Sequence, residues 1–167
     1  MTRKDSTKIE FKRFTDGAAG EVSELITENL WQVNIRDHSR DELLRVADTF
    51  SPQGLIHEKD SVERFILWDK NLLVGAAGLH KTPFDPRIPS HYVSGVFVRV
   101  SLHSRGIGQS LMKYIEDYAL NSGIRKLIIL SSITARDFYL KNGYNPEDDG
   151  DGFNPANNTY MLTKQLT

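Results

Sequence analysis

The chain has 167 residues, 39% hydrophobic and 26% charged, with a formal net charge of -1 at pH 7. This composition excludes an intrinsically disordered chain, and the near-neutral charge predicts no nucleic-acid or membrane partner. The absence of cysteine excludes disulfides, thiolate metal sites and a cysteine nucleophile. The charged N-terminus is not followed by an apolar run, and no stretch approaches the roughly 20 apolar residues of a membrane helix. We therefore expect one domain over residues 1–167, located in the cytoplasm.

The first half of the chain alternates between helical and extended hydrophobic patterns. In chain order these patterns predict a strand, two helices and a two-stranded hairpin at 9–14, 18–30, 40–50, 62–68 and 72–79. Ser51-Pro52 is expected to end the second helix, because proline disfavours a helical conformation in the residue before it. Three prolines between residues 83 and 89 predict a loop after the hairpin.

The second half predicts a strand, a long helix, a short strand, a short helix and a last strand. The expected ranges are 91–100, 105–122, 126–130, 134–140 and 158–166. Residues 91–130 then form a βαβ unit, whereas the first half of the chain is antiparallel. The predicted fold class is therefore α/β, a three-layer α/β/α sandwich with a mixed, mostly antiparallel central sheet.

The junction between the valine-rich strand and the long helix carries the strongest chemical signal. Gly106 and Gly108 allow backbone N–H groups to approach a ligand without obstruction by Cβ atoms. The first turn of a helix leaves N–H donors unpaired and carries the positive end of the helix dipole, which suits a phosphate or pyrophosphate. The glycines also fit a purely structural role, in which they relieve crowding between helix and sheet. Neither a P-loop nor a dinucleotide fingerprint is present.

Two motifs resemble those of one enzyme family. His103-Ser104-Arg105-Gly106-Ile107-Gly108 resembles the acyl-CoA signature [Q/R]-x-x-G-x-[G/A] of the GNAT N-acetyltransferase superfamily. Downstream, residues 135–144 (ARDFYLKNGY) resemble the second motif of that family, A-x-x-F-Y-x-x-x-G-[F/Y]. The motifs occur in the family's order and are separated by one long helix and one short strand. The resemblance implies a GNAT-like fold and acetyl-CoA as co-substrate, with no metal.

The resemblance also implies a set of contacts with the co-substrate. The backbone of Phe97 and Val98 would pair with the pantetheine arm, and the turn from Ser104 to Ser110 would hold the pyrophosphate. His103 stands where the family usually has Gln or Arg, and Ser132 where many members have Asn. The implied co-substrate residues are Phe97, Val98, His103, Ser104, Arg105, Gly106, Ile107, Gly108, Gln109, Ser110 and Ser132.

Tyr139 is implied to lie beside the thioester sulfur, where it would act as the general acid. A phenol with a pKa of about 10 gives a proton to a thiolate of about 8.5 at a modest cost. Without a cysteine to carry an acyl group, the transfer to a primary amine is expected to be direct, in a ternary complex. No general base is assigned among the candidates His80, His91, Glu58, Glu63 and Asp85.

The sequence leaves the acceptor open between a small molecule and a peptide or protein amine, and it is compatible with a homodimer. One alternative is a non-catalytic acyl-CoA-binding or sensor domain of the same fold. Another is a nucleotide or sugar-phosphate enzyme that uses the same glycine turn. Turnover with an amine separates the first alternative from the enzyme, and protection by ATP or NAD rather than coenzyme A identifies the second.

Overall fold

In the computed structural model, which describes residues 9–167, the strands form one mixed sheet with the order β1-β2-β3-β4-β5-β7-β6. The strands are β1 (Ile9–Arg13), β2 (Val62–Asp69), β3 (Leu72–Asp85), β4 (Ile88–Val98), β5 (Lys126–Ser132), β6 (Phe153–Asn154) and β7 (Thr159–Gln165). Of the neighbouring strands in this region, only β4 and β5 are parallel. The predicted α/β class with a mixed, mostly antiparallel sheet is confirmed.

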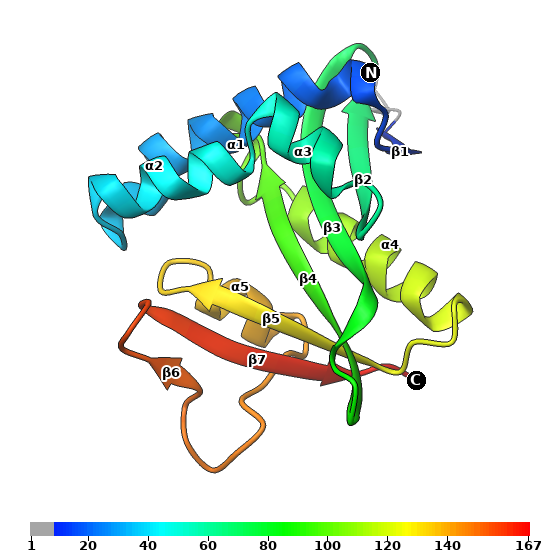
Figure 1. The fold of residues 1–167 in the computed structure, drawn as a ribbon, viewed down its shortest axis with the longest axis vertical. Coiled ribbons are helices and arrows are strands. Elements are labelled where there is room, and N and C mark those ends of the chain that lie inside the picture. Colours follow the sequence, from blue (N-terminus) through cyan, green and yellow to red (C-terminus); the bar gives the residue numbers. More distant parts are fainter. Residues whose placement is uncertain (1–8) are drawn as a thin grey trace, which may run out of the picture.

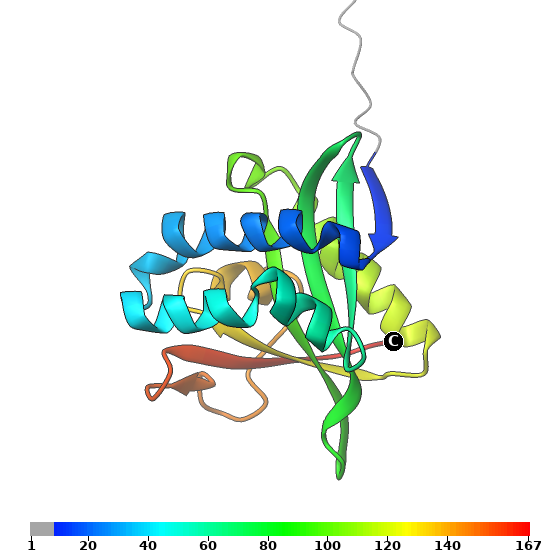
Figure 2. The same ribbon diagram turned by 45° about the horizontal axis from the view of Figure 1, so that its top comes forward.

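Helices cover both faces of the sheet (Figures 1 and 2). The α-helices are α1 (Ala19–Gln32), α2 (Arg40–Thr49), α3 (Pro52–Glu58), α4 (Ile107–Asn121) and α5 (Arg136–Lys141). The short 3₁₀ helices are η1 (Asp16–Ala18), η2 (Asn34–Arg36) and η3 (Val100–Leu102). Helices α1 to α3 lie on one face, and α4 and α5 on the other. Within residues 9–167 no helix has the length and apolarity needed to span a bilayer.

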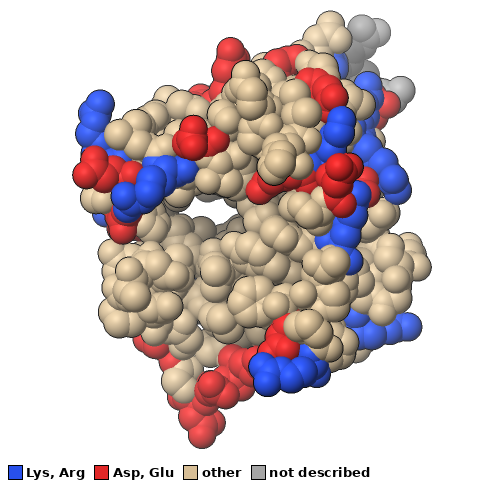
Figure 3. Space-filling model, viewed as in Figure 1, with Lys and Arg blue, Asp and Glu red and all other residues tan. Residues whose placement is uncertain are grey.

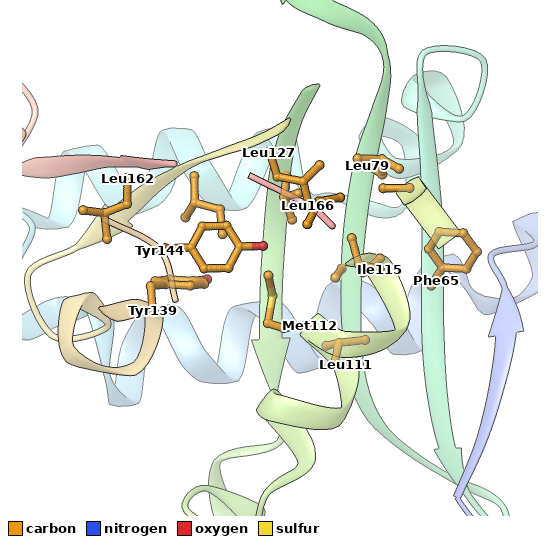
Figure 4. Packing of buried hydrophobic residues seen from close by; sticks show 14 residues of the cluster. Phe65, Leu79, Leu111, Met112, Ile115, Leu127, Tyr139, Tyr144, Leu162 and Leu166 are labelled. Atoms are coloured by element: carbon orange, nitrogen blue, oxygen red, sulfur yellow. The ribbon is translucent and has the colours of Figure 1, made fainter. Parts of the chain in front are cut away.

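Each face has its own hydrophobic cluster. On the α1 face, Leu25 and Ile26 pack with Ile66 and Ala76 of the sheet. On the α4 face the fully buried side chains come from the helix, from distant strands and, for Tyr144, from the segment after α5, as Figure 4 shows: Phe65, Leu111, Met112, Ile115, Leu127, Tyr144 and Leu162. Burial on both faces explains why the central strands are nearly continuously apolar in sequence.

The prediction of a loop around the three prolines was wrong. Strands β3 and β4 continue as a paired hairpin, with Pro83 opposite His91 and Asp85 opposite Ile88. Among the described strands, β3 pairs with β2 only as far as His80, so the side of Pro83 away from β4 faces no strand. Proline lacks an N–H donor and is tolerated where that side of a strand faces outward rather than another strand. The hairpin therefore extends further than the proline pattern suggests.

Helix α3 was not predicted, although its signal is in the sequence. Ser51 and Pro52 do end α2, but they also start the next helix: the Ser51 Oγ accepts a hydrogen bond from the Gly54 N–H at 3.1 Å, and Pro52 occupies the first turn. Serine at the N-cap and proline at the first helical position are favoured at helix starts. The short strand β6 was also missed.

Asn29 joins α1 to the end of β4. It is buried, and its Nδ2 donates to the Leu25 carbonyl and to the Val98 carbonyl, both at 2.9 Å. We expect Asn29→Ala to lower the free energy of unfolding by about 1–3 kcal/mol, because a buried partner loses its hydrogen bond. Urea denaturation measures this, with Asn71→Ala, at an exposed turn position, as the control expected to stay within about 0.5 kcal/mol. Equal stability of the two variants would contradict the assigned role.

Candidate functional site

A large cleft opens where β4 and β5 separate. Their parallel pairing covers Ser90–Val93 of β4 and stops there. The register against β3 then shifts by one residue, and Gly95 adopts a φ of +60°, so β4 carries a bulge that bends it away from β5. The cleft has a volume of about 1070 Å³ and is lined by residues of α1, α2, β4, β5 and α5 and by the start of α4. Figure 3 shows it as an opening bordered mainly by uncharged residues.

The backbone of Val98 faces this cleft. The Arg99 N–H donates to the Val74 carbonyl at 2.9 Å, so Gly75 and Val98 form a non-hydrogen-bonded pair. The N–H and C=O of Val98 therefore point away from β3, whereas those of Phe97 point toward it. Of the two residues predicted to pair with an extended ligand, Val98 presents its amide to the cleft.

His103 holds the strand end instead of reaching outward. Its Nε2 lies 2.8 Å from the Val98 carbonyl, which also accepts the bond from Asn29. Since a carbonyl only accepts, the Nε2 of His103 carries a proton. The two donors satisfy the Val98 carbonyl and leave the Val98 N–H as the group that this residue offers to a ligand.

The start of α4 is a concave turn of backbone amides. Ser104 and Gly106 both have positive φ values, +63° and +82°. The first helical bond runs from the Ser110 N–H to the Gly106 carbonyl at 3.1 Å, so the amides of Ile107, Gly108 and Gln109 precede it. Among residues 9–167 no side chain caps this helix start. The turn is therefore able to bind an anion.

The two glycines of this turn have different roles. A Cβ atom on Gly106 would meet nothing within 4 Å, so packing does not require a glycine here. Glycine instead allows the left-handed conformation and leaves the amides of the turn open to a ligand. A Cβ on Gly108 would lie 3.1 Å from the Cε2 and Cζ atoms of Phe138. Gly108 thus fits the structural interpretation, because it allows α4 and α5 to pack closely.

Most of the predicted co-substrate residues line the cleft. These are Phe97, Val98, His103, Ser104, Gly106, Gly108, Gln109 and Ser132. Arg105, Ile107 and Ser110 do not line it, and the side chain of Ile107 is buried. Ser132 has a structural bond as well, since its Oγ accepts from the Ala135 N–H at 3.2 Å just before α5. Lys141 adds a cation to the lining that the sequence did not single out.

Tyr139 lies at the inner wall of the cleft. Only 6% of it is exposed, and its ring packs edge-on against Phe138 and Tyr144 at centroid distances of 5.1 and 5.9 Å. Figure 4 shows Tyr139 beside Tyr144. Burial raises the pKa of Tyr139 above its ordinary value, with a smaller contribution from Tyr92. The phenol is therefore protonated throughout the neutral range and is available as a proton donor.

The remaining cleft lining contains residues that sequence reasoning did not find: Phe50, Tyr92 and Ser94, with Glu42 of α2. His38, just before α2, lines the cleft as well. No local motif marks these positions, because the bulge in β4 and the packing of α2 bring them together. The cleft therefore extends well beyond the residues predicted to contact the co-substrate.

Among the five candidate bases, His80 is linked to the cleft. Its Nε2 lies 3.0 Å from the Oγ of Ser94. The Nδ1 of His91 lies 2.8 Å from the His80 carbonyl, and His91 is not among the residues that line the cleft. The carboxylates are held in ion pairs elsewhere: Glu58 with Arg64, Glu63 with Arg13 and Asp85 with Arg87. Over residues 9–167, no cluster of three or more histidine or carboxylate side chains is placed to hold a metal ion.

Comparisons with known proteins agree with this geometry. The family model described as the acetyltransferase (GNAT) family matches residues 26–144. The search of curated proteins gives no match. The fold resembles PaiA N-acetyltransferase from Thermoplasma acidophilum in complex with coenzyme A: the TM-score is 0.79 at 15% identity, over 95% of this chain and 99% of the other.

Two further solved structures share the fold. One is a GNAT-family acetyltransferase from Staphylococcus aureus, with a TM-score of 0.72 at 17% identity over 95% of this chain and 99% of the other. The other is N-acetylglutamate synthase from Neisseria gonorrhoeae, complexed with coenzyme A and L-arginine. It matches with a TM-score of 0.62 at 17% identity, over 95% of this chain but 33% of that larger protein.

Proposed function

This chain belongs to the GNAT family of acetyltransferases, and from that premise we propose that it transfers an acetyl group from acetyl-CoA to a primary amine. One observation carries the proposal: the free strand end at Val98 and the amide turn at Gly106 line the same cleft as Tyr139. A diphosphate site, an extended binding edge and a proton donor thus occur together. The coenzyme A complexes of two structural relatives support the choice of co-substrate.

Each part of acetyl-CoA has a matching feature in the cleft. The diphosphate is placed at the amides of the Ser104–Gln109 turn, where the helix dipole favours negative charge. The pantetheine arm lies along the end of β4, in the position that another strand would occupy. The thioester then reaches the depth of Tyr139, and the acceptor enters from the side of Phe50 and Ser94.

The chemistry follows from this arrangement. The Val98 N–H polarises the thioester carbonyl and stabilises the oxyanion that forms when the amine attacks. The C–N bond forms, the C–S bond breaks, and Tyr139 donates a proton to the departing thiolate. The reaction is a direct transfer in a ternary complex, because the chain has no cysteine to hold the acetyl group.

Calorimetry and a turnover screen test the proposal together. We expect saturable binding of coenzyme A at low salt, and thiol release from acetyl-CoA with at least one amine in a panel of small amines, peptide N-termini and lysine peptides. Binding without turnover would favour the acyl-CoA sensor. Protection against thermal unfolding by ATP or NAD, with none from coenzyme A, would favour the nucleotide or sugar-phosphate enzyme.

Several sequence expectations stay predictions beside this proposal. They are a single catalytic domain over 1–167, a cytoplasmic location, a reaction without a metal, the absence of nucleic-acid and membrane partners, and compatibility with a homodimer. The acceptor class is equally open between small-molecule and peptide or protein amines. The panel of amines distinguishes these acceptor classes, because its members differ in size and charge.

A further inference from the structure

We propose that Ser94 and His80 form a proton relay. Ser94 of β4 takes the proton from the acceptor amine and passes it to His80 of β3, the strand on the side of β4 away from the cleft. The inference rests on the proposed function, since it assigns the base of that reaction. An alkyl ammonium has a pKa near 10.4, so a neutral-pH enzyme that binds it must remove a proton before attack. The relay supplies that step without using Glu42, a carboxylate that lines the cleft.

The geometry of the pair supports a relay. Ser94 lines the cleft, whereas His80 is absent from the cleft lining and belongs to that of a second cavity of about 430 Å³. The Ser94 Oγ and the His80 Nε2 are 3.0 Å apart, a hydrogen-bond distance. His80 is partly buried and partly in contact with solvent. The pair therefore connects the cleft with a group that can exchange protons with water.

The bulge in β4 places Ser94 in this position. Ser94 pairs with Gly78 of β3 immediately before the register shift, so it is the last paired residue of β4 before the bulge; pairing resumes at Phe97, opposite Ala76. His80 stands two residues beyond Gly78 on the same face of β3, and Tyr92 stands two residues before Ser94 on the same face of β4. The ring of Tyr92 lies 4.9 Å from that of His80. This packing holds the imidazole against the serine.

The surroundings keep His80 neutral before the reaction. Burial lowers its pKa, and Arg64 of β2 and His91 of β4 act in the same direction. Glu58 of α3 opposes them, but this carboxylate is paired with the Arg64 guanidinium at 2.9 Å. Two other groups complete the neighbourhood: the Tyr92 phenol, and Lys81, whose Nζ donates to the Lys59 carbonyl. A neutral imidazole is the form that accepts a proton.

The proton transfers balance as follows. The Ser94 Oγ accepts a proton from the ammonium while its own hydroxyl proton moves to the His80 Nε2, so serine is regenerated and His80 becomes imidazolium. The free amine attacks the thioester carbonyl, and the C–S bond breaks. Tyr139 protonates the thiolate and is reprotonated by the second proton that the nitrogen loses. His80 finally releases its proton to solvent.

The test is the pH profile of kcat/KM for His80→Gln, measured with acetyl-CoA and the most active amine of the panel. Glutamine keeps a hydrogen bond to Ser94 but cannot take up a proton. The kcat/KM of the variant then depends on the fraction of the amine that is already unprotonated in solution. We expect activity about a thousandfold below wild type at pH 7, because roughly three pH units separate pH 7 from the amine pKa near 10.4; this lies within the usual contribution of a general base. The deficit shrinks about tenfold per pH unit toward the amine pKa.

Two further variants keep the result interpretable. Ser94→Ala breaks the relay at its other end and is expected to show the same convergence at high pH, which also covers the case of a poorly folded His80 variant. His57→Gln, the same substitution at an exposed position of α3, is the matched control with a wild-type profile. A deficit of constant size at every pH, or none in either relay variant, would overturn the relay. Absence of turnover by the wild type with every amine would instead overturn the proposed function.

Discussion

Coenzyme A affinity is expected to fall by about a thousandfold when Gly106 is replaced by valine. Gly106 has a φ of +82°, a conformation that a β-branched residue adopts only with strain. Its missing Cβ also leaves the turn open, since nothing lies within 4 Å of that position. A valine would either cover the amides of Ile107 and Gly108 or shift the turn. Losing two hydrogen bonds to a charged diphosphate, each worth roughly 1.5–3 kcal/mol, gives the stated loss.

Gly123 provides the matched control for this substitution. It follows the other end of α4, with a φ of +83°, and a Cβ atom on it would likewise meet nothing within 4 Å. Gly123→Val thus carries the same backbone strain at a site that does not line the cleft. We expect both variants to lose similar stability and only Gly106→Val to lose affinity in calorimetry. Unchanged coenzyme A binding by Gly106→Val would remove the turn from the site.

The part of the cleft where we propose that the co-substrate binds was largely predictable from the sequence, because local segments form it. A strand, a glycine turn and a helix start are consecutive in the chain, so the amides around Gly106 follow from sequence order. Tyr139 belongs to the second motif, and it indeed lines the cleft. The side-chain bond of His103 to the Val98 carbonyl was not predictable, because it depends on how the turn folds back on the strand.

The part of the cleft where we propose that the acceptor enters was not predictable, for a physical reason. Phe50 follows α2, and Tyr92 and Ser94 belong to β4; Phe50 packs against the bulge at Gly95, so these distant segments meet only in the folded chain. A Cβ on Gly95 would lie 2.7 Å from the Arg64 Nη1 and 3.1 Å from Phe50. In the sequence Gly95 is simply one residue of a predicted strand. In the fold its lack of a side chain leaves room for Arg64 and Phe50 and allows the bulge that shapes the cleft.

The separation of β4 from β5 links the fold to the proposed chemistry. Pairing up to Val93 keeps the sheet intact beneath the cleft, and the bulge beyond it leaves the amide of Val98 without a strand partner on the β5 side. An exposed strand edge is usually a liability that proteins cover. Here the proposed pantetheine arm covers it, so the same unpaired edge that the fold leaves open serves the binding of the co-substrate.

Tyr139→Phe is expected to lower kcat by about a thousandfold at pH 7 while coenzyme A affinity changes little. The substitution keeps the ring that packs against Phe138 and Tyr144 and removes only the hydroxyl. General acids typically contribute 10²–10⁴-fold. Burial raises the pKa of Tyr139, which widens its gap to an ordinary thiol. The same apolar surroundings also raise the pKa of the departing thiolate, so proton transfer between the two stays feasible.

The leaving group distinguishes the acid role of Tyr139 from a structural one. An acetyl thioester of a more acidic thiol needs less protonation as it departs, so the deficit of Tyr139→Phe is expected to shrink with such a substrate. Phe138→Leu is the control: it disturbs the same aromatic cluster but leaves the hydroxyl in place, and its deficit should not depend on the thiol. Because the raised pKa keeps Tyr139 protonated, wild-type activity should show no fall from its ionisation up to about pH 10. Wild-type rates for Tyr139→Phe across this range would show that the thiolate leaves without an acid from the protein.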